Sequence, residues 1–205
     1  MDEKTAKSIH GGLSKPSKMP GFAYGLPAKE CKVGGKLRSV PGSTCSKCYA
    51  LKGRYMFKNV QDALYRRLAA LSNPAWVEAM VYSISRSKVP YFRWHDSGDI
   101  QDMKHLNKIV AVAKACPGVT FWLPTREKAL ISQYLVLNRS FPSNLIVRVS
   151  AAMIGEEYTN QAFLTSSVVL SAEQSNCEAP KQDGKCLDCR KCWDPGVKNV
   201  AYLKH

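Results

Sequence analysis

From about residue 59 onward, the apolar residues of this chain alternate between helical spacing and short continuous runs. Residues 59–72 carry an apolar residue every three or four positions, which predicts a helix. Helical spacing returns between the runs, for example at Met103, Leu106 and Ile109. Four runs are predicted to be strands, at residues 91–95, 119–123, 145–149 and 167–171.

The four predicted strands begin 28, 26 and 22 residues apart, which is the length of a β–α unit. Strands that alternate with helices form parallel sheets joined by right-handed crossovers. Four units are too few for a closed eight-unit barrel, which typically has about 250 residues. We therefore expect an α/β fold, either a partial TIM-like barrel or an open parallel sheet.

The organisation expected is one domain in three parts. Residues 1–58 form an irregular basic arm, since the first 44 hold seven glycines and four prolines with little periodicity. Residues 59–176 form the α/β core. Residues 177–205 form a cysteine-rich tail that binds metal and packs on the core.

Composition points to a globular protein rather than a membrane protein. The chain has 205 residues, of which 45% are hydrophobic. Its longest apolar stretches are far shorter than the ~20 residues of a membrane span. The first ten residues are polar and charged, unlike a secretory signal. We expect no membrane partner and a cytoplasmic location, where reduced thiols persist.

The net charge of +14 is concentrated near the N-terminus. A basic surface attracts polyanions, so nucleic acid is a possible partner. The alternative is a solvated lysine-rich face, because no helix-turn-helix, zinc-finger or RNA-recognition signature is present. The basic residues are Lys29, Lys32, Lys36, Arg38, Lys47, Lys52, Arg54, Lys58, Arg66 and Arg67.

Seven of the eight cysteines lie in two clusters near the chain ends. Cys186, Cys189 and Cys192 have the spacing of the first three cysteines in bacterial ferredoxins, and Cys177 is the nearest fourth ligand. The N-terminal cluster consists of Cys31, Cys45 and Cys48. An iron–sulfur cluster, of the [4Fe-4S] type, is the leading interpretation.

Two alternatives to iron and sulfide compete. Zinc prefers two C-x2-C pairs about 15–20 residues apart, whereas Cys48 and Cys186 are 138 positions apart. Disulfides suit secreted domains, which the N-terminus does not indicate. Cys45 and Cys48 either replace two ligands of the tail or hold a second centre. Four thiolates would suit structure or electron transfer to a partner, and three would leave one iron open.

Polar residues follow directly after the predicted strands, where parallel sheets bind ligands. After the first run come His95, Asp96, Ser97 and Asp99, and we expect Asp99 or His95 to face a ligand. The alternative is that Ser97 or Asp99 caps the next helix. His105 is expected on the polar face of that helix.

Two more polar positions accompany the following strands. Thr125 and Arg126 could bind an anion, or Thr125 could cap a helix. Arg148, inside a predicted strand, is expected to meet an acid such as Asp96 at the mouth of the barrel or to mark a sheet edge.

Four motifs together resemble the phage-encoded family Gene product 88. They are ProGlySerThrCysSerLysCysTyrAla at 41–50, HisAspSerGlyAsp at 95–99, PheTrpLeuProThrArg at 121–126 and CysLeuAspCysArgLysCysTrp at 186–193. The resemblance covers most of the chain and implies phage or prophage origin, hence the host cytoplasm, but no activity.

The strand pattern is also similar to that of radical S-adenosylmethionine enzymes. Those enzymes carry a cluster at the mouth of a partial barrel and a Gly-Gly-Glu-like turn after the second strand, to which residues 97–99 would correspond. They use C-x3-C-x2-C, whereas this chain has Cys31-x13-Cys45-x2-Cys48. The resemblance implies S-adenosylmethionine as a possible cofactor and leaves open whether the protein is an enzyme.

Overall fold

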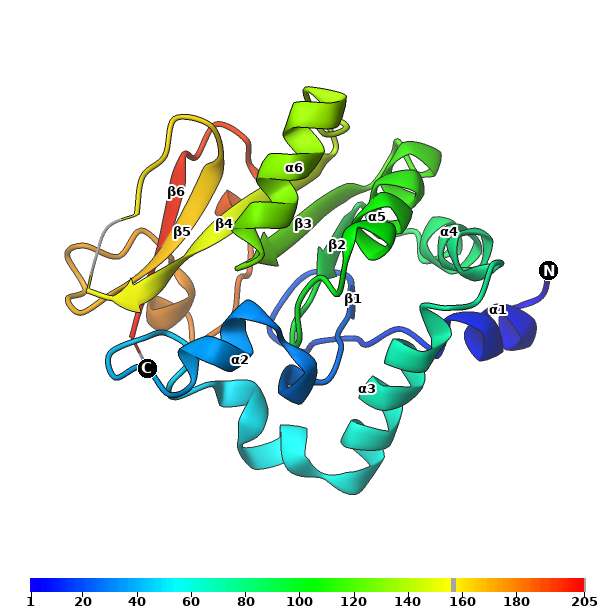
Figure 1. Ribbon diagram of the computed structural model, residues 1–205, viewed down its shortest axis with the longest axis horizontal. Helices are drawn as coiled ribbons and strands as arrows, with labels where there is room; N and C mark the ends of the chain where they lie inside the picture. The colour runs from blue at the N-terminus through cyan, green and yellow to red at the C-terminus, as the bar shows by residue number, and fades with distance from the viewer. Residues whose placement is uncertain (156–157, 205) are drawn as a thin grey trace.

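One parallel sheet of six strands forms the centre of the protein in the computed structural model, which describes residues 1–155 and 158–204 (Figure 1). The strands lie side by side in the same order as in the chain, and each neighbouring pair is parallel. They are β1 (Phe22–Tyr24), β2 (Tyr91–Trp94), β3 (Thr120–Thr125), β4 (Leu145–Ile154), β5 (Leu164–Val169) and β6 (Asn199–Leu203). The expected α/β fold with an open parallel sheet is confirmed.

Strand order equal to chain order makes every connection step in the same direction across the sheet. Because such connections are right-handed, helices that join neighbouring strands gather on one face. Figure 1 shows α4, α5 and α6 over that face, where α5 contacts both neighbours. The helices of this part of the chain are α3 (Lys58–Ala70), α4 (Trp76–Arg86), α5 (Met103–Ala115) and α6 (Lys128–Asn138).

The main core lies between these helices and the sheet. Alternate residues of the central strands, such as Phe92, Trp94 and Phe121, are almost fully buried there. Their rings meet edge-on or stacked, with centroids 4.9–6.1 Å apart. Period-2 alternation thus sends one set of apolar residues of β2 and β3 toward the helices and leaves the alternate set on the opposite face.

The opposite face of the sheet is covered by the C-terminal tail (residues 177–205). Trp193 is 2% exposed and packs edge-on against Trp122, with ring centroids 5.2 Å apart. Its indole nitrogen donates a hydrogen bond to the carbonyl of Phe92, at 2.9 Å. Cys192 and Val200 complete this second, smaller core. A cysteine of the tail is therefore part of a packed interior.

Arg148 of β4 attaches the tail to the sheet. Its side chain is 0% exposed, and its three nitrogens donate to five backbone carbonyls at 2.7–3.3 Å. Four of the carbonyls belong to the tail and one to β5: Lys191, Cys192, Asp194, Val197 and Thr165. The expectation of an acidic partner was wrong, and so was that of a sheet edge, because β4 lies between β3 and β5.

The arm and the tail are more regular than the sequence predicts. The arm supplies the edge strand β1 and the tail supplies the edge strand β6, neither of which was expected. Their other elements are α1 (Glu3–His10), η1 (Ala28–Glu30), α2 (Val33–Leu37), η2 (Tyr49–Leu51), η3 (Gly53–Met56), η4 (Ala179–Lys181) and η5 (Lys191–Trp193).

The arm also pairs with the far end of β4. Ser43 forms an antiparallel bridge with Met153, and the amide of Thr44 donates to the carbonyl of Ala152 at 2.9 Å. This contact holds the segment before Cys45 against the carboxyl end of a central strand. Among the described residues, no helix has the length and apolarity needed to cross a bilayer.

We predict that Arg148→Lys destabilises the protein by at least about 3 kcal/mol, because an ammonium cannot reach five carbonyls arranged for a guanidinium. Urea unfolding measures the loss, and limited proteolysis should show earlier cleavage in residues 177–198. Arg139→Lys, at an exposed arginine after α6, is the control and should behave as wild type. An Arg148→Lys protein with unchanged stability would contradict the role given to this side chain.

Candidate metal and ligand site at the carboxyl edge

The loops that follow β1 and β2 interlock at the carboxyl edge of the sheet. Leu26 and Ser97 exchange two hydrogen bonds of 2.8 Å, one from each residue. Gly98 has φ +76°, and a Cβ there would lie 2.6 Å from the Cβ of Leu26. Only glycine fits this close approach of two loops. The HisAspSerGlyAsp turn thus has a packing role besides any contact with a ligand.

Asp99 joins this turn to the loop after β3. Its carboxylate accepts hydrogen bonds from the Thr125 hydroxyl at 2.6 Å, the Arg126 amide at 2.8 Å and the Ile100 amide at 2.8 Å. Burial raises the pKa of Asp99 to about 6, although these three hydrogen bonds act to lower it. The structure therefore brings Asp99, Thr125 and Arg126 together, as the sequence predicts for strand ends.

The capping roles considered for these residues were wrong. Asp102 is the N-cap of α5, where its carboxylate accepts from the amide of His105 at 2.7 Å. The N-cap of α6 is Glu127, and the Thr125 hydroxyl accepts from its amide at 3.0 Å. The side chain of Arg126 donates to the carbonyl of Ala151. Thr125 and Arg126 therefore connect β3 with its neighbours.

His95 directly follows β2, has a backbone in the left-handed region with φ +52°, and is 3% exposed. Its ring meets His105 edge-on at 5.4 Å, and neither ring nitrogen has a partner among the described atoms. Burial holds the pKa of His95 well below its ordinary value. His105 is 3% exposed, so its expected place on a polar face was wrong.

Asp96 contacts two tyrosines of the arm. Its carbonyl accepts from the hydroxyl of Tyr49 at 2.5 Å and from that of Tyr55 at 3.3 Å. The Tyr49 hydroxyl also accepts from Arg93 at 3.5 Å. The Arg93 guanidinium lies over the Trp122 ring, 4.5 Å from its centroid. Sequence reasoning missed Arg93, although a charged residue at an alternate strand position is the signal that also marks Arg148.

Three thiols, which we call the N-terminal thiol group, lie beside this edge: Cys31, Cys45 and Cys48. A Cβ placed on Gly34 would lie 3.4 Å from the sulfur of Cys45 and 3.9 Å from that of Cys31. Burial raises the pKa of Cys31 to about 12, and the charges of Asp99, Cys48 and Cys45 raise it further. The arm therefore folds three distant thiols around α2, next to Asp99.

Four thiols, which we call the C-terminal thiol group, lie in the tail: Cys177, Cys186, Cys189 and Cys192. Burial raises the pKa of Cys186, and the neighbouring charges of Cys177 and Cys189 add to the effect. Burial likewise raises the pKa of Cys192 to about 11, with Cys177 and Cys186 contributing. The amide of Cys189 donates to the carbonyl of Cys186 at 2.8 Å, which closes a tight turn.

Arg93 lies between the two groups. Burial raises the pKa values of Cys186 and Cys192, and the Arg93 charge opposes both shifts. The hydroxyl end of Tyr49 is enclosed by Asp96 and Arg93 although the ring is exposed, and this burial raises the pKa of Tyr49, which Arg93 lowers and Cys48 raises. On the tail side, the hydroxyl of Tyr202 lies 3.2 Å from the sulfur of Cys192. Both groups thus border one polar region on the tail face of the sheet.

All eight cysteines are free thiols, and Cys116 stands apart, buried at the end of α5. Within residues 1–155 and 158–204, no three His, Cys, Asp or Glu side chains already converge with the geometry of a metal site. The thiols of each group are therefore neighbours that would have to draw together around a metal.

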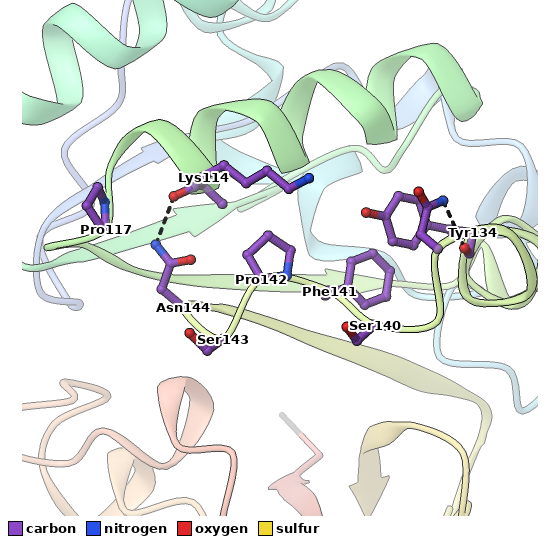
Figure 2. A pocket seen from close by; sticks show the side chains of 10 residues that line it. Lys114, Pro117, Tyr134, Ser140, Phe141, Pro142, Ser143 and Asn144 are labelled. Atoms are coloured by element: carbon purple, nitrogen blue, oxygen red, sulfur yellow. Dashed lines mark hydrogen bonds between the residues drawn. The ribbon is translucent and has the colours of Figure 1, made fainter.

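A hollow lies at the other edge of the sheet, away from these loops. Figure 2 shows it between the ends of α5 and α6 and the loop before β4, with Lys114, Tyr134 and Phe141 around it. Asn144 beside it donates to the carbonyls of Ala113, Cys116 and Val119 at 2.9–3.0 Å. None of the candidate residues lines this hollow, so we assign it no function.

The fold and the two thiol groups define an α/β protein with an open parallel sheet and cysteines gathered from both ends of the chain. The chain belongs to the phage family Gene product 88, whose model matches residues 2–195. Searches of curated proteins and of solved structures give no match.

We predict that Asp99→Asn flattens the pH dependence of stability between about pH 4 and pH 6. The pKa of Asp99 is higher when folded, about 6 against an ordinary 3.8, so folding favours the protonated acid. Its contribution, at most about 3 kcal/mol, is present below pH 4 and lost as the pH rises through 6. Urea unfolding at several pH values measures it.

The exposed carboxylate of Asp62 on α3 provides the matched control. Asp62→Asn should keep the wild-type pH dependence. If Asp99→Asn keeps it as well, the buried carboxyl group does not titrate in this range.

Proposed function

We propose that this protein binds two iron–sulfur clusters, of the [4Fe-4S] type, at the carboxyl edge of its sheet. The N-terminal thiol group supplies three thiolates to one cluster, and the C-terminal thiol group supplies four to the other. The observation that carries the proposal is the gathering of seven free thiols into two groups, each formed by segments separated in the sequence.

The donor set fits this chemistry. Both groups consist of thiols, the soft ligands that iron–sulfur clusters use. The glycine at position 34 leaves space beside two of the sulfurs that any larger residue would fill. The raised pKa values of Cys31 and Cys192 mean that metal binding would release protons from thiols that are neutral without it.

The two groups would support different chemistry. Four thiolates cap every iron, which suits structure or electron transfer with a partner protein. Three thiolates leave one iron open to a substrate or cofactor. The N-terminal group follows β1, and the Ser97–Asp99 turn follows β2, which is the order found in radical S-adenosylmethionine enzymes. S-adenosylmethionine is therefore the first compound to test at the open iron.

The second candidate is a zinc-binding structural protein whose basic surface contacts nucleic acid. The four thiolates of the C-terminal group satisfy the tetrahedral preference of zinc. The tight turn between Cys186 and Cys189 is compatible with either metal. The three-thiolate group favours iron, because structural zinc sites close with a fourth protein ligand.

We predict that anaerobically purified protein contains about eight iron and eight sulfide ions per chain. Cys45→Ala should lose about half of the iron, and Cys189→Ala should lose the other half, because each removes one ligand of a different cluster. Cys116→Ala, in the thiol outside both groups, is the control and should keep all of it. Iron, sulfide and zinc analysis measures the outcome.

Colourless protein with stoichiometric zinc and no sulfide would refute the proposal in favour of the second candidate. Electron paramagnetic resonance of the reduced protein with and without S-adenosylmethionine adds a further readout. A signal that shifts with this compound, and does not shift in Cys45→Ala, would assign it to the N-terminal group.

We predict that Gly34→Ala lowers the iron content without unfolding the protein. Its Cβ would meet the Cβ of Cys31 at 3.3 Å and the sulfur of Cys45 at 3.4 Å. Alanine at the neighbouring Gly35 meets nothing within 4 Å, so Gly35→Ala is the matched control. Both variants gain helix propensity in α2, by up to about 1 kcal/mol. Equal iron contents in the two variants would argue against a cluster beside α2.

A further inference from the structure

The exposed aromatic side chains of this protein are concentrated in one short segment. The chain has 19 Phe, Trp and Tyr residues, and those described by the structure are mostly buried or half-buried. The exposed ones in the described part are Tyr49, Phe57 and Tyr65, at 57%, 59% and 40%. A protein that buries most of its rings and exposes three within 17 positions has a surface suited to stacking.

The same segment carries much of the positive charge. Residues 28–66, which we call the aromatic–basic segment, hold nine basic and two acidic residues, a net +7 out of +14. Eight of the basic side chains are exposed: Lys29, Lys32, Lys36, Lys47, Lys52, Arg54, Lys58 and Arg66. Of these, Lys58 alone forms a salt bridge within the described chain, to Asp62 at 2.7 Å. The charge is thus available to a partner.

The segment lies beside the N-terminal thiol group. It contains all three cysteines of that group, and Tyr49 follows Cys48 directly. Figure 1 shows its α2 and the turns before α3 along the edge where β3 and β4 end. Tyr55 lies next to Tyr49, with ring centroids 5.7 Å apart. A planar group stacked on Tyr49 would therefore lie close to the thiols.

We propose that the aromatic–basic segment binds single-stranded nucleic acid and presents a base to the N-terminal thiol group. Phosphates pair with lysine and arginine, and unpaired bases stack on exposed rings. A duplex hides its base faces, so three exposed rings favour a single strand. The identity of the bound strand as a substrate rests on the proposed cluster, whereas its binding does not.

The test is fluorescence anisotropy with labelled RNA and DNA single strands of about 12 nucleotides, the size that such surfaces cover. The full chain is used both metal-free and loaded with iron and sulfide. We expect Phe57→Ala to weaken binding at least about fivefold, because one stacked base is lost. Leu137→Ala, at a 69% exposed position on α6, is the matched control and should bind as wild type.

A charge pair separates specific binding from general polyanion attraction. The double variant Lys52→Ala with Arg54→Ala should weaken binding. It should also reduce the slope of log K against log salt concentration by roughly 1.4, as for two lost phosphate contacts with a single strand. The control removes two exposed lysines of α5, Lys104→Ala with Lys114→Ala, and should change both quantities less.

Three results would overturn the proposal. The first is unchanged binding in Phe57→Ala. The second is an equal loss of binding in the segment double variant and in the α5 double variant. The third is tighter binding of a duplex or of anionic lipid vesicles than of a single strand. A protein that takes up no iron and sulfide but binds a single strand would support the nucleic-acid surface and refute the cluster proposal. Clusters in a protein that binds no strand would show the reverse.

Discussion

The guanidinium of Arg148 is the interaction on which the arrangement of the tail depends. A charge buried completely in a central strand is unfavourable unless its hydrogen-bonding capacity is used. Arg148 meets this requirement with backbone carbonyls, four of them in the tail. Both sides gain, because the carbonyls of an irregular segment packed on a sheet also need donors. An acidic partner for Arg148 would not do the same, because it would neutralise the guanidinium and leave the tail carbonyls without donors.

The tail can occupy this position because the sheet leaves one face free. Strands in sequential order place the connecting helices on the other face, as for α4, α5 and α6 (Figure 1). The free face then carries Trp122 and Arg148, which bind the tail through Trp193 and the carbonyls around it. Thiols from residue 177 onward therefore lie on the same side of the molecule as the polar region around Arg93.

The sequence is informative where the chain repeats a pattern and less so where tertiary contacts decide. Regular spacing predicted the four central strands, and the strand ends correctly located Asp99, Thr125 and Arg126 beside one another. The edge strands were not predicted because segments of three and five residues carry too little periodicity. In addition, β1 forms through tertiary pairing with β2 and with Ser14.

The predictions for Arg148 and His105 were wrong for a different reason. Arg148 is satisfied by carbonyls some 17–49 positions away, and no local pattern in the sequence encodes such partners. His105 lies at a helix position that looks polar, but its ring packs against Trp76 and His95. Amphipathic spacing identifies the apolar face of a helix. It does not show which side chains from other segments cover the residues beside that face.

The two thiol groups are held in place by different physical means, and this difference bears on their chemistry. In the N-terminal group, Cys31 follows the Leu26 loop against which Gly98 packs, and the segment before Cys45 is paired with the end of β4, so the group is attached to the strand ends. The C-terminal group is held on the free face of the sheet, by Arg148 and Trp193 and by the amides of Cys177 and Cys186, which donate to the carbonyls of Ala201 and Lys18. A cluster that exchanges substrate or cofactor at an open iron needs a fixed position relative to the strand ends. A fully capped cluster needs only its four ligands, because their convergence is enforced by the metal itself. The proposed assignment of the open cluster to the N-terminal group and the capped one to the tail agrees with where the protein holds each group, since only the N-terminal group is attached to the loops at the strand ends.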